Sequence, residues 1–140
     1  MKNNDKRKCR YYLEKGFRSF FQDKAPDLTI KFFQEAIDLN PKDDMLWTIF
    51  AVILYSFDLK EGAGMALEQA LNVNHSNRLA LLLQDFEGDI YISFPFYEEK
   101  EVLKSYIDYF TKNLDKPLKV VKYTDLYFPA EGWLTESGTD

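Results

Sequence analysis

The stretch Asp44-Met-Leu-Trp-Thr-Ile-Phe-Ala-Val-Ile-Leu-Tyr-Ser-Phe57 contains only three polar side chains, those of Asp44, Thr48 and Ser56. Such a run is compatible with a membrane span, a buried strand or a helix. The run from Met45 to Phe57 falls short of the roughly 18 apolar residues that a membrane span needs. It is also long for a strand, which usually has about 5 or 6 residues. Length therefore favours a helix.

The residues on either side of this run also favour a helix. Asp43 and Asp44 precede it, and aspartate is a suitable N-cap because its carboxylate accepts hydrogen bonds from first-turn amides. Pro41 lies just upstream, where a preceding helix should have ended. Downstream, Asp58-Leu-Lys-Glu61 has the spacing of a capping box with aspartate in the cap position. The sequence thus predicts one helix over Met45–Phe57, covered on most sides, and a second helix starting at Asp58.

An internal repeat relates this region to the rest of the chain. The segment Phe32–Pro41 closely matches the segment Ala66–His75. The pairs of residues that recur at the same spacing are Ala36 and Ala70, Leu13 and Trp47, Phe20 and Leu54, and Phe33 and Leu67. Each pair is 34 positions apart (70 − 36 = 34), and we call this spacing the repeat period. It indicates an array of helical hairpins in which each unit buries its apolar face against its neighbours.

The pattern within each unit resembles the tetratricopeptide repeat family. That family places a large, a small and an aromatic residue on a first helix, then two alanines, an aromatic and a proline on a second. Residues 44–77 carry Trp47, Phe50, Ala51, Leu54, Ala63, Leu67 and Ala70, with His75 in the proline position. Residues 10–43 carry Leu13, Gly16, Phe17, Phe20, Thr29, Phe33, Ala36 and Pro41. Gly16 is one place early and Thr29 replaces an alanine. Small residues of this kind let antiparallel helices approach closely, and large ones fill the gaps.

A third, divergent hairpin is predicted over residues 78–116. Its first helix is expected from Arg78 to Tyr91, where apolar residues recur at helical spacing. The segment Ser93-Phe-Pro-Phe96 then interrupts the pattern, and Pro117 would end the second helix. The residues in the second-helix positions are Val102, Tyr106 and Tyr109.

Residues 118–140 lack a helical stripe and contain the breakers Pro129 and Gly132. They are expected to form a short irregular or extended tail, either packed on the domain or flexible. A tail lying in the domain's own groove, or recruiting a partner strand, is the alternative. The predicted fold is therefore all-α: a tetratricopeptide-like superhelix of about three hairpins over residues 1–117, with repeats near 10–43, 44–77 and 78–116, followed by this tail.

Composition and charge narrow the classes of function. The chain has 140 residues and a formal charge of −5. Residues 1–10 carry a local charge of +4, so the remainder carries −9 and should repel phosphate. We expect neither nucleic-acid nor membrane binding. The lone Cys9 cannot form an internal disulfide, and no apolar segment follows the basic N-terminus, so a cytoplasmic location is expected.

Groups for catalysis or metal binding are scarce in the sequence. His75 is the single histidine and falls in a predicted loop, and Cys9 has no general base nearby in sequence. Gly62 and Gly64 lie within a helical pattern, not in a phosphate-binding loop. Three acidic residues lie close together at Asp85, Glu87 and Asp89, but their number and spacing do not match a calcium-binding loop. We therefore predict a non-enzyme with no catalytic residues, metal or cofactor.

The resemblance implies a concave wall built from the first helix of each hairpin. The side chains expected to face this groove are Tyr11, Glu14, Arg18, Phe21, Met45, Thr48, Val52, Tyr55, Leu79, Leu82 and Phe86. Family members that hold the acidic tails of chaperones use lysines and asparagines here, whereas this wall has Arg18 as its only cation. An apolar, aromatic wall suits a hydrophobic peptide or an amphipathic helix.

The expected function is accordingly a non-enzymatic protein–protein interaction module, an adaptor or chaperone that binds a protein or peptide partner. Bacterial secretion chaperones with three such repeats are similar in size and acidity. The alternative is a self-assembling structural subunit that forms a homo-oligomer through its C-terminal tail.

Overall fold

The computed structural model describes residues 2–85, 89–90 and 134–135. This part consists of helices joined by short loops, with one pairing of two short strands. Its elements are the helices α1 (Asn3–Arg18), α2 (Pro26–Leu39), α3 (Asp44–Ser56), α4 (Lys60–Val73) and α5 (Arg78–Asp85), the π-helix η1 (Ser19–Asp23) that continues α1, and the strands β1 (Asp89–Ile90) and β2 (Leu134–Thr135).

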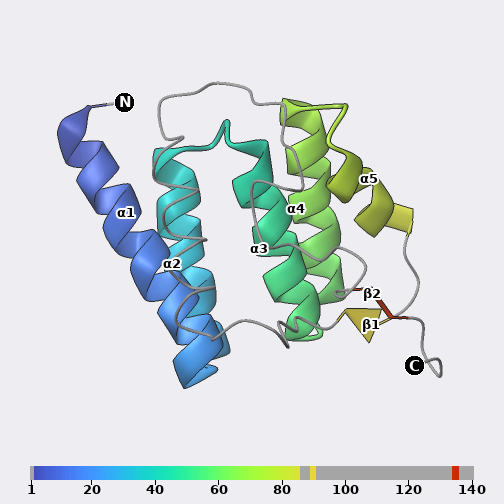
Figure 1. Cartoon of the computed structure of the whole chain (residues 1–140), viewed down its shortest axis with the longest axis horizontal. Helices are drawn as coiled ribbons and strands as arrows, with labels where there is room; N and C mark the ends of the chain where they lie inside the picture. Colours follow the sequence, from blue (N-terminus) through green and yellow to red (C-terminus); the bar gives the residue numbers. More distant parts are fainter. Residues whose placement is uncertain (1, 86–88, 91–133, 136–140) are drawn as a thin grey trace, which may run out of the picture.

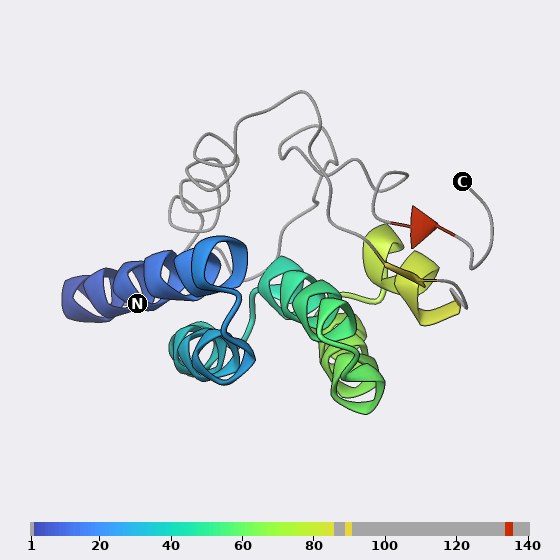
Figure 2. The same cartoon turned by 90° about the horizontal axis from the view of Figure 1, so that it is seen from below.

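Consecutive helices run in opposite directions and pack as neighbours. The most extensive packing joins α1 to α2 and α3 to α4, and α5 packs on α4 (Figure 1). Seen from below, α1, α3 and α5 form one layer while α2 and α4 form the other (Figure 2). This arrangement places α3 at the centre of the first layer.

Helix α3 is the most deeply buried element. Its N-terminus is capped by Asp43, whose carboxylate accepts a hydrogen bond from the amide of Leu46 at 3.1 Å. Ten of its 13 residues are buried, so it is packed on nearly every side. Burial of each large apolar side chain contributes about 1.5–3 kcal/mol to folding. In the part of the chain described, no helix combines the length and apolar character of a membrane span.

The two inter-hairpin loops have several hydrogen bonds in common, displaced by one repeat period. Asp43 caps α3, and Asn77 caps the start of α5 in the same way. The bond from Asn40 N–H to Ala36 O (3.1 Å) matches that from Asn74 N–H to Ala70 O (2.9 Å). The bond from Asp43 N–H to Asn40 O (3.3 Å) matches that from Asn77 N–H to Asn74 O (3.2 Å). The capping bond from Leu46 N–H to Asp43 Oδ1 (3.1 Å) matches that from Ala80 N–H to Asn77 Oδ1 (2.9 Å). The period seen in the sequence therefore has a counterpart in local geometry.

Gly16 lets α1 and α2 approach closely. A Cβ atom at Gly16 would lie 2.9 Å from two ring carbons of Phe33, closer than real Cβ contacts allow. The Phe33 ring in turn packs edge-on against Phe17, with the ring centroids 4.9 Å apart. The small residue thus occupies the point where a side chain would push the two helices apart.

Asp58 does not cap α4, contrary to the sequence prediction. It has a left-handed backbone (φ 62°), and the residue before α4 is Leu59, which makes no side-chain cap. The left-handed turn instead satisfies carbonyls at the end of α3, because the amides of Asp58 and Leu59 donate to the oxygens of Tyr55 and Leu54, both at 2.9 Å. Asp58 therefore helps to terminate α3 and does not cap α4.

The predicted helix from Arg78 to Tyr91 is too long. Helix α5 ends at Asp85, and Asp89–Ile90 forms β1. This strand pairs antiparallel with β2, Asp89 opposite Thr135 and Ile90 opposite Leu134. Ile90 is β-branched and follows Gly88 closely, a combination that disfavours a helix.

Much of the predicted third hairpin and tail lies outside the described residues. This applies to Phe86, to the positions assigned to a second helix (Val102, Tyr106 and Tyr109), and to most of residues 118–140. Within the tail, Leu134–Thr135 is extended and paired with β1.

Candidate binding surface

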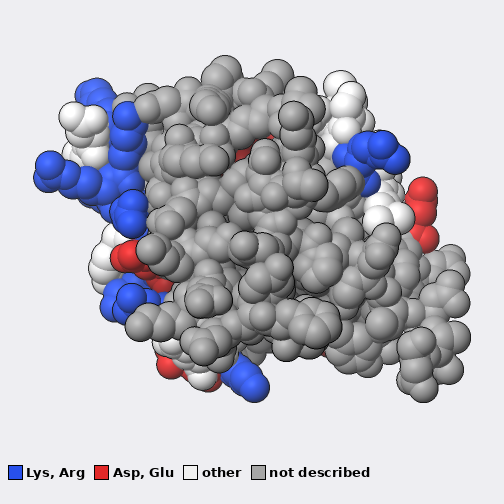
Figure 3. Space-filling model, in the orientation of Figure 1, with Lys and Arg blue, Asp and Glu red and all other residues white. Residues whose placement is uncertain are grey.

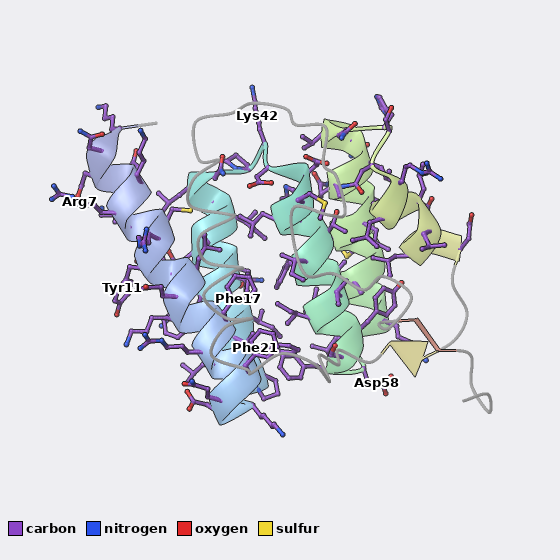
Figure 4. All side chains as sticks on the ribbon, viewed as in Figure 1. Arg7, Tyr11, Phe17, Phe21, Lys42 and Asp58 are labelled. Carbon is purple, nitrogen blue, oxygen red and sulfur yellow. The ribbon has the colours of Figure 1, made fainter. Side chains whose placement is uncertain are left out.

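Basic side chains gather on the α1 side of the molecule (Figure 3). Two of the predicted groove residues lie here in exposed positions: Tyr11, whose exposed fraction is 51%, and Arg18. Glu14 is partly buried. Tyr11 and Arg7 point outward, away from α2 and α3 (Figure 4). These α1 side chains therefore face a surface of their own, at the edge of the helix array.

Phe21 belongs to η1 and faces the opposite way, toward α3 (Figure 4). It packs against Phe20 with ring centroids 5.0 Å apart, and Phe20 packs edge-on against Phe57 just after α3 at 5.5 Å. All three rings are partly buried. This aromatic group joins the end of the first hairpin to the end of α3.

The predicted groove residues of α3 and α5 are mostly interior. Met45, Thr48, Val52 and Leu79 each have an exposed fraction of 1% or less. A partner resting on the surface of this structure would not touch them.

Two predicted groove residues of α3 and α5 remain accessible. Tyr55 is partly buried, and burial raises the pKa of its phenol above the ordinary value of 10.0. Leu82 is 47% exposed, which is a large fraction for leucine.

Met45 and Thr48 lie beside a buried polar network centred on Asn77. The Asn77 amide donates to Asp44 Oδ2 at 2.9 Å and to Thr48 Oγ1 at 3.0 Å, and lies 3.6 Å from the Met45 sulfur. Its two hydrogens serve the two oxygens, which leaves the sulfur as a weaker contact. The Thr48 hydroxyl donates to the backbone oxygen of Asp44 at 2.8 Å. Sequence reasoning missed this network, although Asn77 lies one repeat period after Asp43 and repeats its capping role.

The first repeat lacks the equivalent of this network. Asn74 donates its amide to Asp44 Oδ2 at 3.0 Å, but the amide nitrogen of Asn40, the equivalent residue, is buried without a hydrogen-bond partner. The residue one repeat period before Asp44 is Arg10, which has donors and no acceptor. The first repeat therefore lacks the carboxylate that the second repeat supplies.

The potential catalytic and metal-binding groups are dispersed. Within residues 2–85, 89–90 and 134–135, no group of three His, Cys, Asp or Glu side chains is placed to hold a metal ion. His75 is exposed. Cys9 is buried, and its thiol lies 3.6 Å from the Ala36 carbonyl oxygen as a weak donor.

Comparison with protein-family models, curated proteins and solved structures finds no match to this chain.

Proposed function

We propose that this protein is a non-enzymatic interaction module, an adaptor or chaperone, built as a tetratricopeptide-like superhelix and binding an apolar peptide or helix of a partner protein. The observation that carries the proposal is the recurrence, at the repeat period of the sequence, of the loop hydrogen bonds around Asp43 and Asn77. Repeated hairpins of this kind set their first helices side by side and create an extended binding surface. Cys9 is the one cysteine of the sequence and is buried, which suits a reducing compartment such as the cytoplasm.

The accessible part of the predicted groove supplies the contacts in this proposal. Phe21, Tyr55 and Leu82 present aromatic and aliphatic surface from the layer that contains α3 and α5. Side chains of these types are common anchors at the centre of protein interfaces. Val52 is fully buried, so its replacement would test the core and not the binding surface.

The test is selection of binding peptides from a displayed random library, followed by affinity measurements with variants. We expect the selected peptides to be rich in apolar and aromatic residues. Tyr55→Ala and Leu82→Ser should each weaken their binding at least about tenfold, equivalent to about 1.4 kcal/mol. Met65→Ser is the matched control, because Met65 is 63% exposed but belongs to α4 in the other layer.

Equal losses in the control, or selection of no peptide, would contradict the proposal. Circular dichroism of each variant separates lost binding from lost folding. The alternative function, self-assembly through residues 118–140, makes a different prediction: light scattering would show a mass that grows with concentration and falls when these residues are removed.

A further inference from the structure

The outward side of α1 is rich in cations. Within residues 2–18, seven basic and two acidic side chains give a net charge of +5, so residues 19–140 carry −10. Lys6, Arg7 and Lys8 lie within the first two turns of α1, opposed there by Asp5. Positive charge near this end is repelled by the N-terminal end of the helix macrodipole, which is itself positive.

Four of these cations share one face with Tyr11. At 3.6 residues per turn, Arg7, Lys8, Tyr11, Lys15 and Arg18 fall within a sector of about 100°, opposite the buried side of α1. That buried side consists of Cys9, Leu13, Gly16 and Phe17. The sector is exposed throughout, and we call it the α1 basic face.

The cations of the α1 basic face have little local neutralisation. Arg7, Lys8, Lys15 and Arg18 form no ion pair with another described residue, and the carboxylate of Glu14, next to Lys15 in sequence, is partly buried. Lys15 instead places its ammonium 5.7 Å from the centre of the Tyr11 ring. This cation–π contact places the Tyr11 ring within the positive surface.

We propose that the α1 basic face binds an acidic segment of a partner protein. Arg7 and Arg18 are eleven positions apart and so span about 17 Å along the helix. An extended segment of about five or six residues covers that distance at about 3.3 Å per residue. Carboxylates at such spacing would offset the repulsion among the four cations, and that of Arg7 and Lys8 with the positive end of the macrodipole.

Other polyanions fit this face less well. A nucleic acid or an anionic membrane extends beyond α1 and would also meet the remainder of the chain, which carries −10. The face carries no large aliphatic side chain to insert into a bilayer, and Tyr11 is already engaged by Lys15 and by the edge of Tyr12. A short acidic peptide meets only the positive region.

The test measures fluorescence anisotropy of a labelled peptide of about six residues rich in Asp and Glu. We expect saturable binding that weakens as salt is raised. The double variant Arg7→Glu, Lys15→Glu should lose at least about tenfold in affinity, and Arg7→Gln, Lys15→Gln should lose less. The control is Lys31→Glu, Lys42→Glu, which makes the same change in net charge at exposed positions on α2 and the α2–α3 loop, and should change the affinity less than about twofold.

Equal losses in the control pair, or absence of saturable binding, would overturn this inference. Tighter binding to a single-stranded oligonucleotide of similar charge, or to phosphatidylserine vesicles, would overturn it in favour of phosphate recognition. The inference is independent of the proposed function: the variants of the α1 basic face should still bind the apolar library peptides, and Leu82→Ser should still bind the acidic one.

Discussion

The clearest energetic contrast between single residues is that between Asn77 and Asn40, which lie in comparable loops. Asn77 donates to the Asp44 carboxylate and to Thr48, and it accepts from the Ala80 amide at the start of α5. Asn40 has a buried amide nitrogen without a partner. A buried hydrogen bond to a charged group contributes about 1.5–3 kcal/mol, whereas a buried polar group without a partner costs about 1–3 kcal/mol.

We therefore expect Asn77→Ala to lower the free energy of unfolding by about 2–4 kcal/mol, since it removes both the bonds to Asp44 and Thr48 and the cap. Asn40→Ala removes a buried amide nitrogen that has no partner, so it should leave the free energy of unfolding unchanged or raise it. Asn77→Asp separates the two roles, because it keeps the cap acceptor but sets a second carboxylate beside Asp44. Urea unfolding followed by circular dichroism measures all three. Similar losses for Asn40→Ala and Asn77→Ala would show that the network contributes no stability of its own.

At the scale of elements, two glycines in helices have opposite roles. Gly16 lies against Phe33, where an added Cβ would be 2.9 Å from the ring, while nothing lies within 4 Å of a Cβ built at Gly64. Gly16→Ala should destabilise the protein by about 1–3 kcal/mol through overpacking of α1 against α2. Gly64→Ala should stabilise it by about 0.5–1 kcal/mol by restricting the unfolded chain and favouring α4. Thermal unfolding of the two variants checks this, and a stabilising Gly16→Ala would mean that α1 and α2 do not approach so closely.

The same scale separates what the sequence could predict from what it could not. Helix α3 was predictable, because its apolar run and the Asp43 cap are local signals. Asp58 was misassigned because aspartate suits both an N-cap and a left-handed turn, and the end of α3 decides between them. The strand Asp89–Ile90 was missed because it depends on pairing with Leu134–Thr135, a segment far away along the chain.

The candidate binding surface was less predictable than the fold. The family resemblance assigned Met45, Thr48 and Leu79 to an open wall from their helical positions alone. Their burial depends on contacts made in three dimensions, such as those of Asn77 with Met45 and Thr48. The α1 basic face shows the reverse case: its charges are evident in the sequence, but their convergence on one outward face requires knowing which side of α1 is buried.

At the scale of the whole molecule, the two complete hairpins are held together by fewer contacts than hold each hairpin together. Aromatic pairs bridge them: Phe33 stacks near Phe50 with ring centroids 6.1 Å apart, and Phe20 meets Phe57 edge-on at 5.5 Å. In repeat proteins, such interfaces between units provide the coupling that makes unfolding cooperative. The pair Phe20–Phe57 is the better target, because both rings are partly buried and their replacement disturbs the core less.

We expect a double-mutant cycle with Phe20→Leu and Phe57→Leu to give a coupling free energy of about 0.5–1.5 kcal/mol, the usual value for an aromatic pair. Leucine keeps an apolar side chain at each position and removes the ring contact. The double variant should also unfold less cooperatively in urea, with a smaller dependence of the unfolding free energy on urea concentration, because the hairpins then separate more readily. Additive effects with an unchanged urea dependence would show that the joint between the hairpins resides elsewhere, for instance at Phe33 and Phe50.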